Sequence, residues 1–269
     1  MRNKNLTGTG VALITPFHQN NSIDFDSLKN LINHLITNEI DYLVVMGTTG
    51  ESAVLTHDEQ NKIIKYVKKI VNNRLPIIVG LGGNDTMQVV NRIKSFDFNG
   101  IEAILSVCPY YNKPSQSGIF SHYSQLSKVS PVDIILYNVP SRTSVNISVE
   151  TVVSLAEKYQ NIVGIKEASG NIEQCMDLVS SCPDDFMIIS GDDKMTFPIM
   201  LLGGVGVISV QAMAFASLFS TMIQASLRGD IDLARKCHYE LMKSVDLFYV
   251  NGNPSSMKNK RIFNFFCAH

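Results

Sequence analysis

Short apolar runs alternate along this chain with longer segments in which apolar residues recur at the spacing of a helix. Most of these runs are continuous, which is typical of strands that a parallel sheet buries on both faces. The alternation predicts βα units repeated around a parallel sheet. Eight strands are expected, over Gly10–Thr15, Tyr42–Met46, Ile77–Gly80, Ala103–Ser106, Ile134–Tyr137, Ile162–Lys166, Met187–Ser190 and Val205–Ser209.

Helical segments fill the intervals between these strands. The clearest helix start is at Thr56, which forms a capping box with Glu59 just before an amphipathic stripe. After the eighth strand, Leu218–Leu227 and Ile231–Val250 are also helical in pattern.

Eight strands with intervening helices favour a closed barrel over an open sheet. An open dinucleotide-binding sheet would carry a G-x-G-x-x-G turn after its first strand, and this chain has none there. We therefore expect an α/β fold, a (β/α)₈ or TIM barrel over residues 1–225. A helical C-terminal extension is expected over residues 226–269.

Composition and charge narrow the class of protein further. The 269 residues are 45% hydrophobic and 17% charged, which suits a single large enzyme domain with its own core. A net charge of -1 gives no reason to expect nucleic acid or an anionic membrane as a partner. No stretch resembles a signal peptide or a membrane span, and the five cysteines form no C-x-x-C pair. A cytoplasmic location is expected.

In such a barrel, active-site residues lie at the carboxyl ends of strands, and Lys166 ends the sixth expected strand. A lysine attacks a carbonyl only when it is neutral, and burial favours the neutral amine. Lys166 is therefore a candidate nucleophile that forms an imine. The alternative is a strand-end lysine that extends to solvent or pairs with Glu167.

Two further strand ends, those of the second and the fifth expected strands, carry candidate residues. Tyr137 could move protons for Lys166, or could simply pack at the barrel rim. The loop Gly47–Ser52 lacks the lysine of a P-loop and fits a carboxylate better than a nucleotide, or it is a plain turn. Arg142 offers a planar fork to a second carboxylate, or is a surface arginine.

Two kinds of site are disfavoured by what the sequence lacks. The six histidines show no H-x-x-x-H or H-x-H spacing, which argues against a metal-dependent aldolase. No G-x-S-x-G elbow suggests a serine hydrolase. We expect no metal and no organic cofactor.

Six motifs occur from Leu6 to Pro254 in a characteristic order: G-V-A-L-I-T-P-F, G-T-T-G-E-S, P-Y-Y-N-K-P-S-Q, Y-N-V-P-S-R-T, G-I-K-E-A-S-G and G-N-P. Together they resemble the dihydrodipicolinate synthase and N-acetylneuraminate lyase superfamily of class I aldolases. The branch that the chain resembles condenses pyruvate with aspartate 4-semialdehyde in lysine and diaminopimelate biosynthesis. Arg142 favours this branch, since sialic-acid lyases typically lack an arginine there.

The resemblance implies a role for each candidate residue. Lys166 would form the imine with pyruvate, and Tyr137 would be the general acid and base. Thr48 and Tyr111 would complete a proton relay. Tyr111 would reach across an interface, so the protein would be a homo-oligomer, commonly a dimer of dimers.

The same resemblance implies a set of substrate contacts. Thr49 and the backbone at Ile208 would hold the pyruvate carboxylate, and Gly191 would belong to the same pocket. Arg142 would bind the carboxylate of the semialdehyde.

The superfamily's lysine effector pocket has partial counterparts here. The matching positions are Ser52, Ala53, His57, Asn84 and Tyr110. Gln60 and Gln88, however, stand where lysine-sensitive members often carry histidine and glutamate. An amide binds an ammonium less strongly than a carboxylate does, which weakens the expectation of lysine inhibition.

The chain also departs from the family's pattern at its end, over Lys258–Cys267. We expect a shortened, atypical C-terminus that would disturb a tetramer. Two alternative functions stay open: a sister lyase for N-acetylneuraminate or a 2-keto-3-deoxy sugar acid, and a non-catalytic barrel that binds 2-oxo acids.

Overall fold

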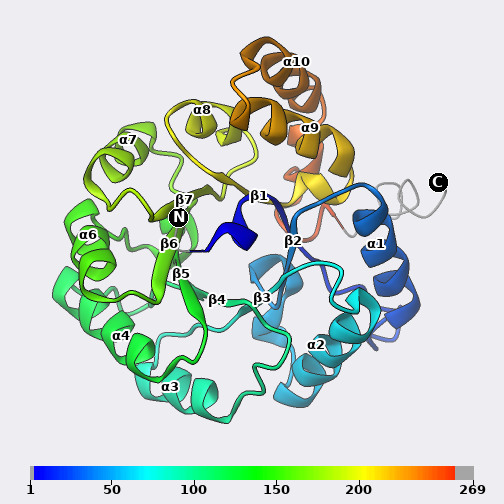
Figure 1. Ribbon diagram of the computed structural model, residues 1–269. Helices are drawn as coiled ribbons and strands as arrows, with labels where there is room; N and C mark the ends of the chain where they lie inside the picture. Colours follow the sequence, from blue (N-terminus) through cyan, green and yellow to red (C-terminus); the bar gives the residue numbers. More distant parts are fainter. Residues whose placement is uncertain (1–2, 258–269) are drawn as a thin grey trace.

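Eight parallel strands pair in sequence order and close into a barrel, with β8 paired to β1 (Figure 1). The structure is a computed structural model that describes residues 3–257. The predicted TIM barrel is confirmed, and every expected strand is present. The strands are β1 (Gly8–Ala12), β2 (Tyr42–Val45), β3 (Ile77–Gly80), β4 (Ala103–Val107), β5 (Asp133–Asn138), β6 (Ile162–Glu167), β7 (Met187–Ser190) and β8 (Gly206–Ser209).

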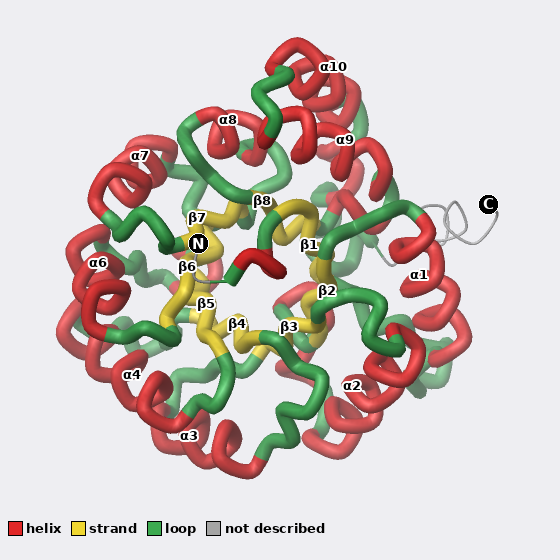
Figure 2. Tube along the Cα trace, in the orientation of Figure 1, coloured by secondary structure: helices red, strands yellow, loops and turns green. Residues whose placement is uncertain are grey.

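Helices form a ring around the barrel, and α10 lies outside this ring against α9 (Figure 2). The helices are α1 (Phe25–Thr37), α2 (His57–Val71), α3 (Thr86–Ser95), α4 (Gln116–Val129), α5 (Pro140–Thr143), α6 (Val149–Lys158), α7 (Ile172–Ser181), α8 (Thr196–Leu201), α9 (Ala216–Leu227) and α10 (Ile231–Met242). Five short 3₁₀ segments complete the chain: η1 (Lys4–Leu6), η2 (Thr48–Gly50), η3 (Ser52–Val54), η4 (Gln211–Met213) and η5 (Val245–Phe248).

Local sequence explains where several helices begin. The predicted capping box is present at α2, where the Thr56 backbone N–H donates to Glu59 and the Glu59 N–H donates to the Thr56 hydroxyl. Asp24, Asp85 and Ser148 cap α1, α3 and α6 in the same side-chain-to-backbone manner. Each such cap stabilises a helix by about 1 kcal/mol.

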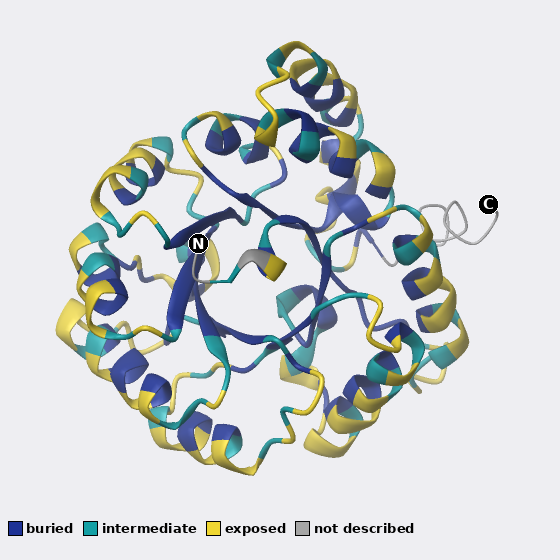
Figure 3. Cartoon of the chain, viewed as in Figure 1, coloured by how far each residue is buried: buried dark blue, intermediate teal, exposed yellow. Residues whose placement is uncertain are grey.

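The barrel strands are buried on both faces, as Figure 3 shows in dark blue. Their inward side chains form a lumen cluster, and Leu6 of η1 closes it at the amino-terminal end. Barrel closure depends on glycine, because a Cβ at Gly206 would lie 2.1 Å from the Gly8 carbonyl oxygen. Side chains thus fill the barrel lumen at its amino-terminal end, which leaves the carboxyl ends of the strands as the place for a site.

The largest departures from the predicted boundaries are at the first strand and the last helix. The first strand is Gly8–Ala12, because Gly8 to Val11 pair with β8. The predicted helix Ile231–Val250 is wrong beyond Met242. There the Gln211 amide donates to the Leu241 carbonyl at 2.8 Å and to the Ser244 hydroxyl at 3.0 Å, which satisfies the end of α10 before η5 begins.

Other expectations about the C-terminal region are untested. The predicted division after residue 225 would fall within α9, and it stays a prediction. The atypical segment Lys258–Cys267 lies outside the described residues. Within residues 3–257, the structure contains no helix with the length and hydrophobicity needed to cross a membrane.

Candidate active site

Lys166 and Tyr137 lie side by side at the carboxyl ends of β6 and β5. The two residues are register partners on adjacent strands. Lys166 is 6% exposed and Tyr137 is 7% exposed, and the Lys166 Nζ lies 4.4 Å from the centre of the tyrosine ring. The lysine amine is therefore largely shielded from water and faces an aromatic surface.

Glu167 does not pair with Lys166, because successive residues of a strand point to opposite sides of the barrel wall. Its carboxylate is buried and accepts hydrogen bonds from Asn138 at 2.9 Å, Gln174 at 2.8 Å and the Ser169 N–H at 2.7 Å. Within residues 3–257, no carboxylate forms an ion pair with Lys166. The alternative reading of Lys166 as half of a structural ion pair has no counterpart in the fold.

Gly191 gives the lysine stem its space. A Cβ at this position would lie 2.9 Å from Lys166 Cε and 2.6 Å from the Ala168 Cβ. The Gly191 N–H donates to the Glu167 carbonyl at 2.7 Å, so the backbone cannot easily retreat. Gly191 thus controls where Lys166 can point.

The loop after β2 folds into η2, which presents Thr48 and Thr49. Thr49 is 3% exposed, whereas Thr48 is half-buried. The Thr15 hydroxyl donates to the Gly50 carbonyl at 2.6 Å and fixes the loop against the end of β1. The loop predicted to bind a carboxylate therefore has a defined shape, which Thr15 after β1 holds in place.

Asn253 joins this loop to Arg142, which sequence reasoning did not foresee. The Asn253 amide donates to Thr49 Oγ1 at 3.0 Å, and its carbonyl accepts from Arg142 Nη2 at 3.1 Å. Asn253 belongs to the G-N-P motif, and that motif was the only sequence signal pointing to it. Its role depends on a contact between residues more than 200 positions apart.

Asp193 and Tyr249 form a second pair that the sequence did not reveal. Asp193 is 3% exposed and accepts hydrogen bonds at 2.8 Å from the Gln211 N–H and from the Tyr249 hydroxyl. Burial raises the pKa of the Asp193 carboxyl, and the hydrogen bonds oppose that shift. Together with Asn253, this pair ties the segment after α10 to the carboxyl ends of the barrel strands.

Tyr111 projects away from the rest of the chain. Its side chain is 83% exposed and its φ is 74°, in the left-handed region. Within residues 3–257 its hydroxyl makes no hydrogen bond, so no direct hydrogen bond joins Tyr111 to Tyr137 in the single chain.

A cavity of about 370 Å³ lies beside Tyr137 and gathers only some of the predicted residues. Thr48, Tyr137 and Arg142 line it, together with apolar side chains of β4. Thr49, Lys166, Ile208 and Gly191 are not among its walls. Ile208 lies in the lumen cluster on β8, where it pairs with Gly10 of β1.

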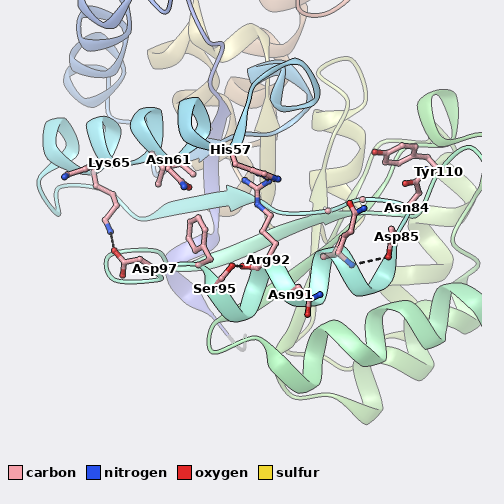
Figure 4. Close-up of a pocket in the computed structure, with 17 residues that line it drawn as sticks. His57, Asn61, Lys65, Asn84, Asp85, Asn91, Arg92, Ser95, Asp97 and Tyr110 are labelled. Carbon is pink, nitrogen blue, oxygen red and sulfur yellow. Dashed lines mark hydrogen bonds and ion pairs between the residues drawn. The ribbon is translucent and has the colours of Figure 1, made fainter.

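The predicted effector residues divide between two cavities. Ser52 and Ala53 line the cavity beside Tyr137. His57, Asn84 and Tyr110 line a larger groove of about 1240 Å³ between α2 and α3 (Figure 4).

Arg92 lines both cavities and was not predicted as a site residue. Its guanidinium donates to His57 Nδ1 at 2.6 Å and to the Gln60 side-chain oxygen. Gln60 in turn donates to the carbonyls of Ser52 at 2.8 Å and Leu55 at 3.0 Å. Gln60 thus links Arg92 in the groove to Ser52, the last residue of the loop that carries Thr48 and Thr49.

A closed barrel that buries a lysine amine against a tyrosine, near a threonine loop and an arginine, has the arrangement that a Schiff-base lyase requires. The chain belongs to the dihydrodipicolinate synthetase family, whose model matches residues 5–261. It is similar to 4-hydroxy-tetrahydrodipicolinate synthase of Flavobacterium psychrophilum, with 48% identity over 251 residues. That match covers 93% of this chain and 86% of the relative.

Solved structures agree with this assignment. The crystal structure of dihydrodipicolinate synthase from Aquifex aeolicus is 39% identical, with a TM-score of 0.89 over 93% of this chain and 85% of that chain. A monomeric dihydrodipicolinate synthase variant has a TM-score of 0.90 at 35% identity, over 93% and 84%. The Cyanidioschyzon merolae enzyme with lysine bound has the same TM-score and identity, over 96% and 89%.

Proposed function

We propose that the chain condenses pyruvate with aspartate 4-semialdehyde through an imine on Lys166, giving 4-hydroxy-tetrahydrodipicolinate. The observation that carries the proposal is the buried Lys166 amine, which faces Tyr137 and pairs with no carboxylate within residues 3–257. A carboxylate partner would stabilise the ammonium and hinder attack on a carbonyl. The name of the relatives, 4-hydroxy-tetrahydrodipicolinate synthase, gives the product that these two substrates would form and so supports the proposal.

The reaction begins when the neutral Lys166 amine attacks the C2 carbonyl of pyruvate. Tyr137, beside the amine, supplies and removes the protons as the carbinolamine forms and loses water. The protonated imine is an electron sink, so a pyruvate methyl proton can leave to give an enamine. The enamine carbon then attacks the aldehyde carbon of the second substrate. Finally the amino group of the semialdehyde attacks the imine carbon, closes the ring and releases the lysine.

Asn253 orients the Thr49 hydroxyl, which would bind the carboxylate of pyruvate. Because its amide donates to Thr49 Oγ1, the Thr49 hydroxyl hydrogen is left to donate to a carboxylate. The backbone at Ile208 and Gly191 would complete this carboxylate site. Arg142, held at its edge by the Asn253 carbonyl, would bind the carboxylate of the semialdehyde.

The proton relay of Tyr137, Thr48 and Tyr111 requires a second chain in this proposal. The exposure of Tyr111 and its left-handed backbone support a residue presented to a partner subunit. We propose a homodimer as the minimal active unit, and a dimer of dimers as the full assembly. A cytoplasmic location, and lysine binding at Ser52, Ala53, His57, Asn84 and Tyr110, stay predictions.

Borohydride trapping tests the central step. Pyruvate plus borohydride should add the mass of a reduced pyruvyl group to the protein, and peptide mapping should place it on Lys166. Lys166→Ala should remain unlabelled, whereas Lys158→Ala, which changes an outer helix, should label normally. An unlabelled parent protein would overturn the imine mechanism.

A coupled assay separates the leading function from its alternatives. The parent protein, without borohydride treatment, should turn over aspartate 4-semialdehyde only with pyruvate present. Cleavage of N-acetylneuraminate without this condensation would indicate a sister lyase. Labelling of Lys166 with no turnover of either substrate would favour the non-catalytic barrel.

A further inference from the structure

Four polar side chains form a closed ring of hydrogen bonds at the carboxyl ends of β5 and β6. We call it the Glu167 ring, and its members are Glu167, Asn138, Asn146 and Gln174. Asn138 donates to Glu167 at 2.9 Å and to Asn146 at 2.8 Å. Asn146 donates to Gln174 at 2.7 Å, and Gln174 donates to Glu167 at 2.8 Å. The ring thus joins two strand ends to α7 and to the loop before α6.

The register of β5 and β6 places this ring directly behind Lys166 and Tyr137. Those two residues pair with each other, and the next residues along the strands, Asn138 and Glu167, also pair with each other. Because successive residues of a strand point to opposite sides, the first pair faces the barrel interior and the second faces the outer helices. Figure 1 shows α6 and α7 on that outer side. The ring can therefore position the site without touching a substrate.

Glu167 is the charged member of the ring, and neutral groups hold it. Its side chain is 1% exposed, and its second carboxylate oxygen accepts from the Ser169 N–H at 2.7 Å. Within residues 3–257 it forms no ion pair. A buried carboxylate without a cation depends on its hydrogen bonds, since each donor that is lost leaves the charge poorly solvated. Movements that would open the ring are therefore disfavoured.

The ring also closes the loop that carries Arg142. Arg142 lies in α5, within the connection that runs from Asn138 to Ile147. The Asn138 side chain contacts the far end of this connection twice: its amide donates to Asn146, and its oxygen accepts from the Ile147 N–H at 3.0 Å. The two ends of the loop are thereby held together, and Glu167 holds the residue that joins them.

Lys166 depends less on the ring than Arg142 does. The backbone holds the two strand ends, because the Ala168 N–H donates to the Asn138 carbonyl at 2.9 Å and the Gly191 N–H donates to the Glu167 carbonyl at 2.7 Å. These bonds do not involve the ring side chains. Opening the ring should therefore displace the Arg142 loop while Lys166 stays beside Tyr137.

We propose that Glu167 is a positioning residue, which acts through Asn138 to set where Arg142 meets the second substrate. The inference rests on the function proposed above, in which Lys166 binds pyruvate and Arg142 binds the carboxylate of aspartate 4-semialdehyde. Glu167 itself touches neither substrate. Its effect is on the recognition of the semialdehyde, because a bidentate contact between a guanidinium and a carboxylate requires accurate placement of both groups.

Asn138→Asp opens the ring and tests the proposal. It sets two buried carboxylates against each other where an amide hydrogen bond had joined them, and like charges repel. The KM for aspartate 4-semialdehyde should rise roughly tenfold, whereas the KM for pyruvate should change by less than about threefold. Steady-state kinetics with each substrate varied in turn measure both values.

Adding Glu167→Gln to Asn138→Asp should restore the ring with its hydrogen bonds reversed. The amide introduced at position 167 can donate to the carboxylate introduced at position 138, once Asn146 and Gln174 turn their amides over. The KM for the semialdehyde should return to within about threefold of the parent value. Glu167→Gln alone sets an amide N–H against another donor and should raise this KM.

Two further variants separate positioning from a general loss of stability. Asn161→Asp makes the same exchange at the opposite end of β6, where Asn161 donates to the Ser127 carbonyl at 2.9 Å, and it should change neither KM. Asn146→Ala removes an exposed member of the ring and should fold even where Asn138→Asp does not. It should raise the KM for the semialdehyde alone, by about threefold. Circular dichroism verifies that each variant is folded.

Amide hydrogen exchange tests the same contact without turnover. Residues 139–147 should exchange faster in Asn138→Asp, and at the parent rate in the double variant and in Asn161→Asp, because the Ile147 N–H donates to the Asn138 side chain. A parent protein with no turnover but with this exchange pattern would contradict the proposed function and support the positioning of the loop. Equal rises of both KM values in Asn138→Asp and Asn146→Ala, or a double variant no better than Asn138→Asp, would overturn the proposal.

Discussion

At the scale of single residues, the proposed chemistry of this protein depends on how Lys166 is surrounded. Its stem packs against Gly191, its amine faces the Tyr137 ring, and the neighbouring carboxylate of Glu167 is turned to the other side of the strand. The strand alternation separates the buried Lys166 amine from a buried carboxylate that would otherwise stabilise the unreactive ammonium. Because Lys166 and Glu167 are adjacent in β6, their side chains face opposite sides of the barrel wall and do not form an ion pair.

The space at Gly191 gives the first residue-scale prediction. In Gly191→Ala the new methyl would lie 2.9 Å from Lys166 Cε, so the lysine must move. A displacement of about 1 Å can cost about 100-fold in rate, and we expect the rate of pyruvate trapping to fall by roughly 10- to 100-fold. Mass spectrometry over a borohydride time course measures this rate.

Gly118→Ala is the matched control, since it adds the same methyl to outer helix α4. The control should trap pyruvate at the parent rate, and both variants should keep the parent circular dichroism spectrum. A Gly191→Ala protein that traps at full speed would show that the lysine stem does not depend on this space.

The contact between Asn253 and Thr49 gives the second residue-scale prediction. In Asn253→Asp the carboxylate would accept the Thr49 hydroxyl hydrogen and repel the carboxylate of pyruvate. We expect the KM for pyruvate to rise by about tenfold or more, with a smaller change in kcat, because ground-state binding is lost. Steady-state kinetics at saturating semialdehyde measure both.

Asn251→Asp makes the same exchange two residues away, at an exposed position, and should change neither constant. Equal effects of the two substitutions would point to a general charge effect on the segment instead of a specific contact with Thr49.

At the scale of elements, each strand end and helix start reflects its own short sequence. The capping box at Thr56 and the continuous apolar strands have local causes, and both were predicted correctly. The end of α10 was not, because it is set by Gln211, a residue thirty positions earlier in η4. The local pattern thus predicted the start of α2, whereas the end of α10 depends on a side chain that is distant in the sequence.

The contact between α3 and α4 predicts a pH dependence of stability. His122 of α4 is 2% exposed, one ring nitrogen hydrogen-bonds the Thr86 hydroxyl at 2.8 Å, and burial lowers its pKa from 6.5 to about 4. Between these values the unfolded chain binds the proton and the folded chain does not. The free energy of unfolding should therefore decrease as the pH falls from 6.5 towards 4, by about 3 kcal/mol from this residue.

Urea unfolding at pH 7, 6, 5 and 4 measures that slope. His122→Gln keeps a hydrogen-bonding group but cannot be protonated, so its stability should fall less steeply over this range. His18→Gln, at an exposed position, should retain the slope of the parent. Parallel curves for all three proteins would rule out His122 as the source.

At the scale of the whole molecule, the end of the described chain returns across the barrel mouth. Tyr249 reaches Asp193 after β7, and Asn253 reaches both Thr49 after β2 and Arg142 after β5. Three separated strand ends are thereby joined by one segment. The catalytic face is an assembly of distant pieces, and the proposed partner subunit adds one more through Tyr111.

Mixing two inactive variants tests that partner. If Tyr111 acts across an interface, a dimer of Tyr111→Phe with Lys166→Ala contains one intact site and one doubly altered site. After unfolding and refolding an equal mixture, random pairing should restore about a quarter of the parent activity. Each variant refolded alone supplies the baseline. If the mixture shows only the average of the two baselines, Tyr111 acts within its own chain or not at all.

The sequence by itself determined the barrel, its eight strands and the strand-end positions of Lys166, Tyr137 and the Thr48–Thr49 loop. These features could be predicted because burial and short-range hydrogen bonding impose periodic patterns on residues that are neighbours in the sequence. Only the tertiary structure decided that Asn253 contacts Thr49 and that Arg92 lies between two cavities. Those contacts join residues far apart in the chain, and their geometry exists only once the barrel has closed.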